Sequence, residues 1–362
     1  MTLMTPTSLP YLIIGQGLCG TWLSYYLLKA GKKVIVIDQP QPYSATKVAS
    51  GIINPVTGRR IVRTWRIEEL LSFAIESYNE LGNQLDAAVM KQIVVLDFHP
   101  TLQMKEAFEN RVLEEPEYLH TINDEFYKQF FNYHYGAGSI APCLLIDLHT
   151  MLNGWREKLK EQEALLEDQF DWANCIIHGD QVKYKDVVAE KIICCEGVAG
   201  FDNPYFKNLP YSHMKGEAII AAIDGLPNDR IFKHGLSIVP WRNNLFWIGS
   251  SYEWEFDDVK PTAVFRQKVE SFLHQFVKLP YTIVDHIASD RPANMERRPF
   301  VGLHPNHPQV GILNGMGTKG CSLAPFFAQQ LAGYLIDGKS IYPDADVRRF
   351  ESVLRKNILD ML

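Results

Sequence analysis

Short apolar runs and helix-spaced apolar residues alternate at the start of the chain. Residues 11–14 and residues 34–37 are unbroken apolar runs with the length of a buried strand. Between them, apolar side chains recur at the i, i+3, i+4 and i+7 spacing of a helix that packs against a sheet, at Cys19, Trp22, Leu23, Tyr26, Leu27 and Ala30. This pattern predicts a strand–helix–strand unit.

The turn between the first strand and the helix contains glycines in a GxGxxG spacing. Gly15 permits the tight turn, Gly17 lets the backbone approach a pyrophosphate, and Gly20 lets the helix press against the strand. The free N–H groups at the helix start, where Leu18 and Cys19 lie, attract the phosphates. A GxGxxG by itself is more often a flexible loop, but this one lies inside the strand–helix–strand unit that a cofactor site requires.

An acidic residue ends the second strand. Asp38 stands about 20 residues beyond the glycine turn, where a carboxylate accepts hydrogen bonds from a ribose diol. Gln39, the next residue, is placed in the same site. The unit therefore predicts a dinucleotide site, and an ADP moiety without a 2′-phosphate is its best interpretation.

A second Gly-rich loop lies near the other end of the chain. Residues 310–314 have the pattern of a buried strand, and an amphipathic helix pattern runs to about residue 336. The loop between them contributes further predicted cofactor-binding residues, Gly315, Gly317, Thr318, Lys319 and Gly320. Two such loops far apart in the sequence predict a long ligand that is held at both ends. FAD meets this requirement better than a nicotinamide cofactor, because its isoalloxazine ring must be held permanently.

The middle of the chain changes its pattern twice. A strand at residues 93–97 opens a region, residues 108–135, that is rich in charge and aromatics and has no sheet-and-helix rhythm. A helix pattern at residues 148–166 and two apolar strands then predict a return to the cofactor domain. These strands are residues 175–177 and 191–195. Antiparallel strands that wall a substrate pocket are predicted next, at residues 218–222, 236–239 and 245–249.

The length and net charge of the chain limit the classes of protein to which it can belong. A chain of 362 residues with 46% hydrophobic residues favours two domains. The net charge of −6 disfavours a nucleic-acid partner. One basic cluster stands apart, formed by Arg59, Arg60, Arg63 and Arg66. A solvated or phosphate-facing stretch is favoured there over RNA contact.

The cysteines, histidines and apolar stretches favour a cytoplasmic protein without a metal site. The six cysteines form no CxxC motif and two of them are adjacent, which favours a reducing compartment over a disulfide framework. The eleven histidines form no HExxH motif. The N-terminus lacks a signal-peptide pattern, and the apolar stretch at residues 321–336 is too short to span a bilayer. We therefore expect no metal, no membrane span and a cytoplasmic location.

Further motifs lie between the two Gly-rich loops in a fixed order. They are Ala49-Ser50-Gly51 with the loop to Pro55, Glu196-Gly197, Lys215-Gly216-Glu217, Val239-Pro240, Ile248-Gly249-Ser250-Ser251-Tyr252, Arg291-Pro292 and Arg298-Pro299-Phe300-Val301-Gly302. Together with both loops, this ordered set resembles the D-amino-acid-oxidase-like (DAO) superfamily of FAD-dependent oxidoreductases, which includes glycine oxidase and sarcosine oxidase. The resemblance covers nearly the whole chain.

The resemblance implies a mixed α/β fold. A Rossmann-like FAD-binding domain would be interleaved with a mostly antiparallel-sheet substrate domain. The FAD-binding domain would comprise residues 1–90, 141–212 and 287–362, and the substrate-binding domain residues 91–140 and 213–286.

The resemblance also extends the cofactor site. Ser50, Gly51 and Gly197 join the predicted cofactor-binding residues. FAD is expected to be noncovalent, because no cysteine stands beside Arg291, where sarcosine oxidases carry the flavin link.

Two side chains receive roles near the substrate from the same resemblance, and Lys319 is assigned to the flavin because of its charge. Arg291 would hold a substrate carboxylate through a bidentate pair, and a structural ion pair with Asp285 or Asp290 is the alternative. Tyr252 would project into the pocket, with an aromatic core residue as the alternative. Lys319 and the start of the last helix would bring positive charge to the flavin N1–C2=O edge.

The reaction that the resemblance implies is removal of a hydride from a C–H next to an amine. The substrate would be a small carboxylate-bearing molecule, an amino acid or N-substituted amino acid, and oxygen or another acceptor would take the electrons. Alternatives that stay open are oxidation of a 2-hydroxy acid, oxidation of a modified tRNA base, and flavin binding without turnover. The sequence departs from glycine oxidase at Ser237 and at Thr318-Lys319, which puts glycine or another small amino acid in doubt as the substrate.

Overall fold

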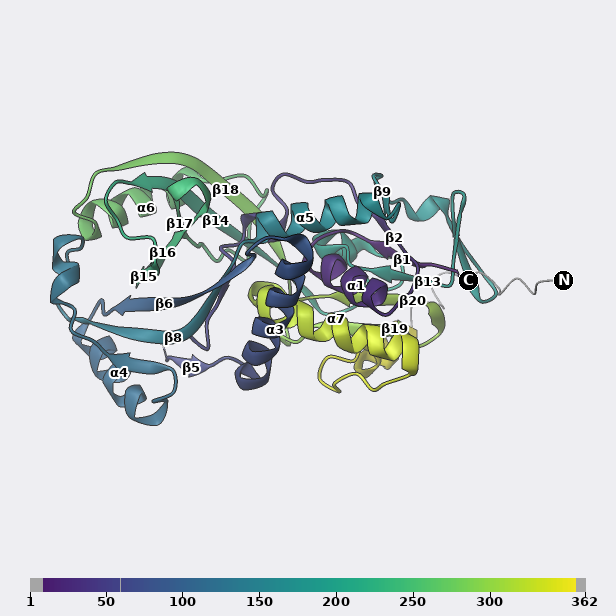
Figure 1. The fold of residues 1–362 in the computed structure, drawn as a ribbon, viewed down its shortest axis with the longest axis horizontal. Coiled ribbons are helices and arrows are strands. Elements are labelled where there is room, and N and C mark those ends of the chain that lie inside the picture. The colour runs from purple at the N-terminus through teal and green to yellow at the C-terminus, as the bar shows by residue number, and fades with distance from the viewer. Residues whose placement is uncertain (1–8, 59, 356–362) are drawn as a thin grey trace.

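The computed structural model describes residues 9–58 and 60–355, and two large sheets lie toward opposite ends of its long axis (Figure 1). The six-stranded sheet has the order β19-β20-β13-β1-β2-β9. Its strands are β1 (Tyr11–Ile14), β2 (Val34–Ile37), β9 (Leu165–Leu166), β13 (Lys191–Cys194), β19 (Phe300–His304) and β20 (His307–Asn314). All are parallel except β19, which pairs antiparallel with β20 at one edge.

Both faces of the six-stranded sheet are covered, which explains why its strands read as unbroken apolar runs. Ile13 packs on one face with side chains of four helices. These helices are α1 (Leu18–Lys29), α3 (Ile67–Leu85), α5 (Leu148–Glu161) and α7 (Gly320–Asp337). Leu12 and Ile14 pack on the other face, beneath a small antiparallel sheet. The small sheet consists of β10 (Cys175–His178), β11 (Gln181–Tyr184) and β12 (Val187–Ala189). The predicted strand–helix–strand unit, β1-α1-β2, is confirmed.

The second large sheet has nine strands. Its order is β18-β14-β17-β16-β15-β6-β8-β3, with β7 paired to β8. The strands are β3 (Ile52–Ile53), β6 (Met90–Phe98), β7 (Leu119–Thr121), β8 (Ala137–Ile146), β14 (Tyr211–Ile223), β15 (Arg230–His234), β16 (Leu236–Pro240), β17 (Phe246–Gly249) and β18 (Tyr281–Asn294). The two large sheets draw on segments that alternate along the chain, as the mixed, interleaved fold requires. The exact division into domains by residue number stays a prediction.

The two faces of the nine-stranded sheet differ in chemistry. On the outer face, Phe98, Phe232 and Ile248 pack against α6 (Ala263–Phe276) in a separate apolar core. The inner face borders a cavity, and its lining includes Asp97, Lys233, Ser237, Trp247 and Gly249. Because successive side chains of a strand point to opposite faces, each of these strands supplies both a core and a cavity wall.

Two predictions about the middle of the chain are wrong. The helix predicted at residues 148–166 ends at Glu161, because Glu163 adopts a left-handed conformation (φ 53°) and the chain then enters β9. The strand predicted at residues 175–177 belongs to the small antiparallel sheet and not to the cofactor sheet. Gly179, with φ 56°, lies in the turn that leads the chain back into β11.

Several elements have no counterpart among the predictions. They include α3, α6, β15, β18 and α4 (Leu102–Glu114), which begins ahead of the aromatic region. The remaining short elements are α2 (Ala45–Val48), β4 (Val56–Thr57), β5 (Val62–Arg63) and α8 (Glu351–Leu354). The predicted antiparallel strands are confirmed as parts of β14, β16 and β17.

Candidate active site

A cavity of about 2560 Å³ lies between the two large sheets and is lined by residues of both. Ordinary ligand pockets have roughly 300–1,000 Å³, so this cavity is large enough for a long cofactor together with a substrate. Most of the residues predicted for the site line it: Gly15, Gly17, Leu18, Cys19, Asp38, Gln39, Ser50, Gly51, Gly197, Tyr252, Arg291, Gly317, Thr318, Lys319 and Gly320. Gly20 and Gly315 do not line it.

The glycines of the first loop have different surroundings. A Cβ on Gly20 would lie 1.8 Å from the carbonyl oxygen of Gly15, so only glycine lets α1 approach β1 this closely. A Cβ on Gly17 would face the cavity, where the nearest atom is Thr46 Oγ1 at 3.6 Å. Gly17 is the N-cap of α1 and has no side chain to cap the helix, while the N–H of Leu18 donates to Thr46 Oγ1 at 3.4 Å. The loop therefore forms an open cradle at a helix N-terminus, which fits a pyrophosphate.

Asp38 is held in place by two donors at the end of β2. Its Oδ1 accepts the backbone N–H of Gln16 at 2.8 Å, and its Oδ2 accepts Nη1 of Arg156 at 2.7 Å. Arg156, on α5, also donates to Gln16 Oε1 at 2.9 Å and to Glu167 at 2.9 Å. Sequence reasoning missed Arg156, because no local pattern connects residues 118 positions apart.

The second Gly-rich loop brings a cation to the cavity. A short 3₁₀ turn, Gly317–Lys319, leads into α7. Burial lowers the pKa of Lys319 to about 8, and within the described ranges no carboxylate pairs with it. Gly315 acts through packing, since a Cβ there would lie 2.9 Å from the ring of Phe300.

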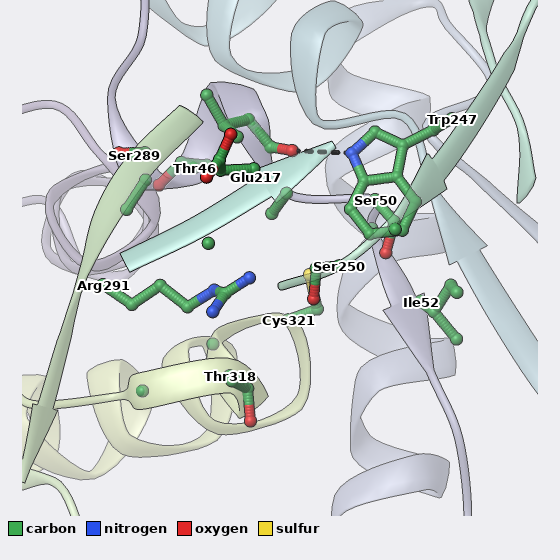
Figure 2. A pocket seen from close by; sticks show the side chains of 18 of the residues that line it. Thr46, Ser50, Ile52, Glu217, Trp247, Ser250, Ser289, Arg291, Thr318 and Cys321 are labelled. Carbon is green, nitrogen blue, oxygen red and sulfur yellow. Dashed lines mark hydrogen bonds between the residues drawn. The ribbon is translucent and has the colours of Figure 1, made fainter. Parts of the chain in front are cut away.

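Arg291 projects from β18 into the cavity. Figure 2 shows its guanidinium pointing inward, above Thr318 and beside the strand that carries Glu217. The guanidinium lies against Gly216 of β14, where a Cβ would stand 1.8 Å from Nη2. Nη1 donates to the carbonyl oxygen of Ser251 at 3.3 Å. Burial lowers the pKa of Arg291, although the nearby Tyr252 and Asp290 oppose this shift.

The structural ion pair offered as an alternative for Arg291 is not formed among the described residues. Asp290 instead pairs with His213 and accepts the N–H of Met214 at 2.9 Å. Asp285 is exposed and accepts the N–H of His286 at 2.7 Å. The guanidinium thus has no carboxylate partner in the part of the chain that the structure describes.

Tyr252 lies over Arg291 at the cavity edge. The guanidinium carbon is 5.1 Å from the centre of its ring, and 61% of the tyrosine is exposed. The alternative of an aromatic core residue is therefore wrong.

Trp247 connects the two sides of the cavity. Its indole N–H donates to the carbonyl oxygen of Val48 at 2.9 Å, as the dashed line in Figure 2 shows. The ring lies over Gly249, where a Cβ would stand 2.7 Å from Cη2. The bond attaches the segment that carries Ser50 and Gly51 to the nine-stranded sheet. An aromatic residue within a strand pattern gives no sign of this role.

The arginine cluster forms no free basic face in the structure. Arg63 pairs with three glutamates, Glu68, Glu115 and Glu117. Arg66 pairs with Glu69 and lies 3.9 Å from the ring centre of Tyr342. Arg60 lines the cavity, and Arg59 lies outside the described residues. Arg63 and Arg66 are therefore engaged by other side chains of the protein and do not present free charge to a polyanion.

Within residues 9–58 and 60–355, the structure has neither a metal-binding cluster nor a membrane-spanning helix. No group of three His, Cys, Asp or Glu side chains is placed to hold a metal ion. No helix combines the length and apolar character that crossing a membrane requires. The six cysteines are free thiols.

Comparison with known protein families matches this chain to the family described as FAD dependent oxidoreductase (DAO), over residues 11–334. The chain belongs to this family. It is accordingly an FAD-dependent oxidoreductase, and FAD is its cofactor.

Relatives of this DAO protein are distant in sequence and close in fold. It is 22% identical over 358 residues to "Uncharacterized oxidoreductase YurR" of Bacillus subtilis (strain 168), across 89% of this chain and 93% of that protein. The solved structure of glycine oxidase from Bacillus cereus ATCC 14579 has a TM-score of 0.77 at 16% identity and covers 92% of this chain and 96% of its own. Iminodiacetate oxidase from Chelativorans sp. BNC1 has a TM-score of 0.74 at 19% identity, with coverages of 91% and 96%. At these identities the solved structures show the shared fold alone.

The two glycines of the first loop predict separable defects. Gly17→Val is expected to abolish FAD binding and leave the fold intact, because the new side chain enters the open cradle. Gly20→Ala is expected to lower Tm, because its Cβ would collide with the Gly15 carbonyl. The ratio of flavin to protein absorbance and the melting temperature measure both effects. A Gly17→Val protein that stays fully yellow would contradict the cradle.

The Asp38–Arg156 pair predicts a second defect in cofactor binding. Arg156→Met is expected to weaken FAD binding on the order of 10-fold, the scale of one lost charge-assisted hydrogen bond. Asp38→Ala is expected to weaken it as well, and the double variant to lose little more. Lys160→Met is the control, because Lys160 lies on the same helix and contacts Glu167 but not Asp38. Equal FAD dissociation constants for Arg156→Met and the control would show that Arg156 is only a surface cation.

Proposed function

We propose that this DAO protein oxidises a C–H next to an amine on a small carboxylate-bearing substrate, an amino acid or N-substituted amino acid. The observation that carries the proposal is the Arg291 guanidinium, which faces the cavity, is partly desolvated and has no carboxylate partner among the described residues. A buried charge without a partner is costly. A substrate carboxylate would satisfy this charge.

The surroundings of Arg291 support a carboxylate clamp. Gly216 leaves room for the planar guanidinium to lie against β14, and Ser251 takes only one of its donors. The remaining N–H groups match the bidentate geometry of a carboxylate. Tyr252 covers the guanidinium from the solvent side and would limit access of water to the pair.

The residues of the cavity divide into a cofactor part and a substrate part in this proposal. Gly17, Leu18 and Cys19 would hold the pyrophosphate, and Asp38 with Gln39 the ribose. Ser50, Gly51, Gly197, Gly317, Thr318, Lys319 and Gly320 would surround the rest of the cofactor. When bound, FAD accepts the hydride and so supplies the redox chemistry. Lys319 and the start of α7 would contribute positive charge at this end.

The cysteines support noncovalent binding of FAD. Cys19, Cys195 and Cys321 line the cavity. Burial raises the pKa of the Cys19 and Cys321 thiols to about 12 and that of the Cys195 thiol well above its usual value. The thiolate is the reactive form of cysteine, so none of the three side chains is activated to bond a flavin.

The names of solved relatives point to the same class of substrate. Structures with this fold include a glycine oxidase, an iminodiacetate oxidase and an L-proline dehydrogenase from P. horikoshii. Each of these names contains an amino acid or an imino acid.

Substitutions at Arg291 and Gly216 test the clamp. Arg291→Ala is expected to cost on the order of 2–5 kcal/mol of substrate binding while FAD content and Tm persist. Arg291→Lys is expected to recover little, because an ammonium cannot form the planar fork. Gly216→Ala is expected to raise KM with the charge still present, because its Cβ would displace the guanidinium from its place on β14. An unchanged KM in Arg291→Ala would remove the clamp.

The substrate class is tested with the purified holoenzyme. Anaerobic bleaching of the flavin absorbance is measured against D-amino acids, L-amino acids, N-substituted amino acids and 2-hydroxy acids. We expect bleaching by an amino acid or N-substituted amino acid. Bleaching by 2-hydroxy acids alone would overturn the amine assignment. The rate at which the colour returns after oxygen is admitted then distinguishes an oxidase from a dehydrogenase.

A further inference from the structure

We propose that Lys233, oriented by Asp97, forms a second anion subsite in the same cavity, so that the substrate carries a distal acidic group in addition to the carboxylate at Arg291. This inference rests on the proposed clamp at Arg291 and specifies the substrate class further. Both Lys233 and Asp97 line the cavity.

The pair is built into two neighbouring strands. Asp97 of β6 and Lys233 of β15 stand directly opposite each other in the parallel register, and Nζ lies 2.6 Å from Oδ2. The Asp97 side chain is 6% exposed, whereas that of Lys233 is 26% exposed. An ammonium has three donors, and Asp97 is the one carboxylate within residues 9–58 and 60–355 that pairs with it. The group presented to the cavity is therefore the ammonium, which suits an anion.

A continuous row across the sheet connects this pair to the strand of Arg291. From Lys233 the register passes through Ser237 of β16, Gly249 of β17 and Ala218 of β14 to Ile287 of β18. Cross-strand neighbours share a face of the sheet. At the positions of the row itself, the three strands between its ends carry only the small residues Ser237, Gly249 and Ala218.

Arg291 and Lys233 stand at opposite ends of the resulting trough. Arg291 lies four residues beyond Ile287 on β18, which places it on the same face. The ring of Trp247 lies over Gly249 and gives the trough an apolar floor near its middle. This floor suits an aliphatic chain between two acidic ends.

The row is too long for a single carboxylate to bind both Lys233 and Arg291. Four strand spacings of about 4.8 Å separate the backbones of Lys233 and Ile287, on the order of 19 Å along the sheet. The Arg291 guanidinium lies over Gly216 of β14, whereas the Lys233 ammonium is bonded to Asp97 of β6, just beyond the row, so the two cations stay well apart. Two acidic groups on one substrate would occupy the two cations together.

A purely structural ion pair is the competing explanation. Such a pair between two strands gives little net stability when it is buried, and it would confer no preference among ligands of the cavity. Ligand preference therefore separates the two explanations.

The test is a titration of the holoenzyme with unreactive straight-chain acids, followed by the change in the absorbance of bound FAD. Monocarboxylates from butyrate to decanoate are compared with α,ω-dicarboxylates from succinate to sebacate. One dicarboxylate is expected to bind at least about 10-fold more tightly than the monocarboxylate of equal length, the gain of one charge-assisted hydrogen bond. The length at which the gain is largest measures the separation of the two subsites.

Variants assign the gain to Lys233. Lys233→Met is expected to abolish the dicarboxylate preference, and Lys233→Arg to retain part of it. If Lys233→Met fails to fold around an unpaired Asp97, the double variant Lys233→Met with Asp97→Asn removes both charges and is used in its place. Lys268→Met is the control, because Lys268 lines the cavity outside the row.

The outcomes distinguish this inference from the proposed function. Equal affinities for monocarboxylates and dicarboxylates at every length overturn the second subsite and leave the clamp at Arg291. A preference that survives in the Lys233 variants overturns the assignment to Lys233. Failure of every carboxylate to bind wild-type protein overturns the clamp, and the second subsite with it.

Discussion

The contact between α1 and the end of β1 governs the cofactor side of the molecule. The helix begins so close to the carbonyl of Gly15 that a single methyl group at Gly20 would overlap it. This approach directs the N-terminus of α1 at the cavity and brings Asp38, at the end of the next strand, beside it. The coverage of one face of the six-stranded sheet depends on the same contact, since α1 packs in one core with α3, α5 and α7.

A second close approach governs the substrate side. The guanidinium of Arg291 occupies the space that Gly216 leaves on the neighbouring strand, and the ring of Trp247 occupies the space above Gly249. Two glycines on adjacent strands thus allow large side chains to lie flat on a sheet. The inner face becomes a cavity wall, while the outer face of the same strands packs against α6.

The elements that sequence reasoning identified are those with strong local signals. The bounds of β1 and β2 agree with the predicted runs, because strands buried on both faces are apolar at every position. The helix predicted to residue 166 is too long, since Glu163 reverses the chain without any glycine or proline to mark the turn. The strand at residues 175–177 has an apolar pattern that is compatible with either sheet, and only its pairing with β11 decides between them.

Local patterns in the chain are enough to identify the glycine cradle, the acidic end of β2, the second Gly-rich loop and the family, because each depends on residue types at short fixed spacings. The partners of these residues follow only from the folded arrangement. In the folded chain, Arg156 bonds to Asp38, and Lys233 pairs with Asp97 on the neighbouring strand. Asp285 and Asp290 contact other groups and do not pair with Arg291. The physical reason is that ion pairs and close packing join residues far apart along the chain, whereas periodicity reports only the contacts that neighbours in sequence make.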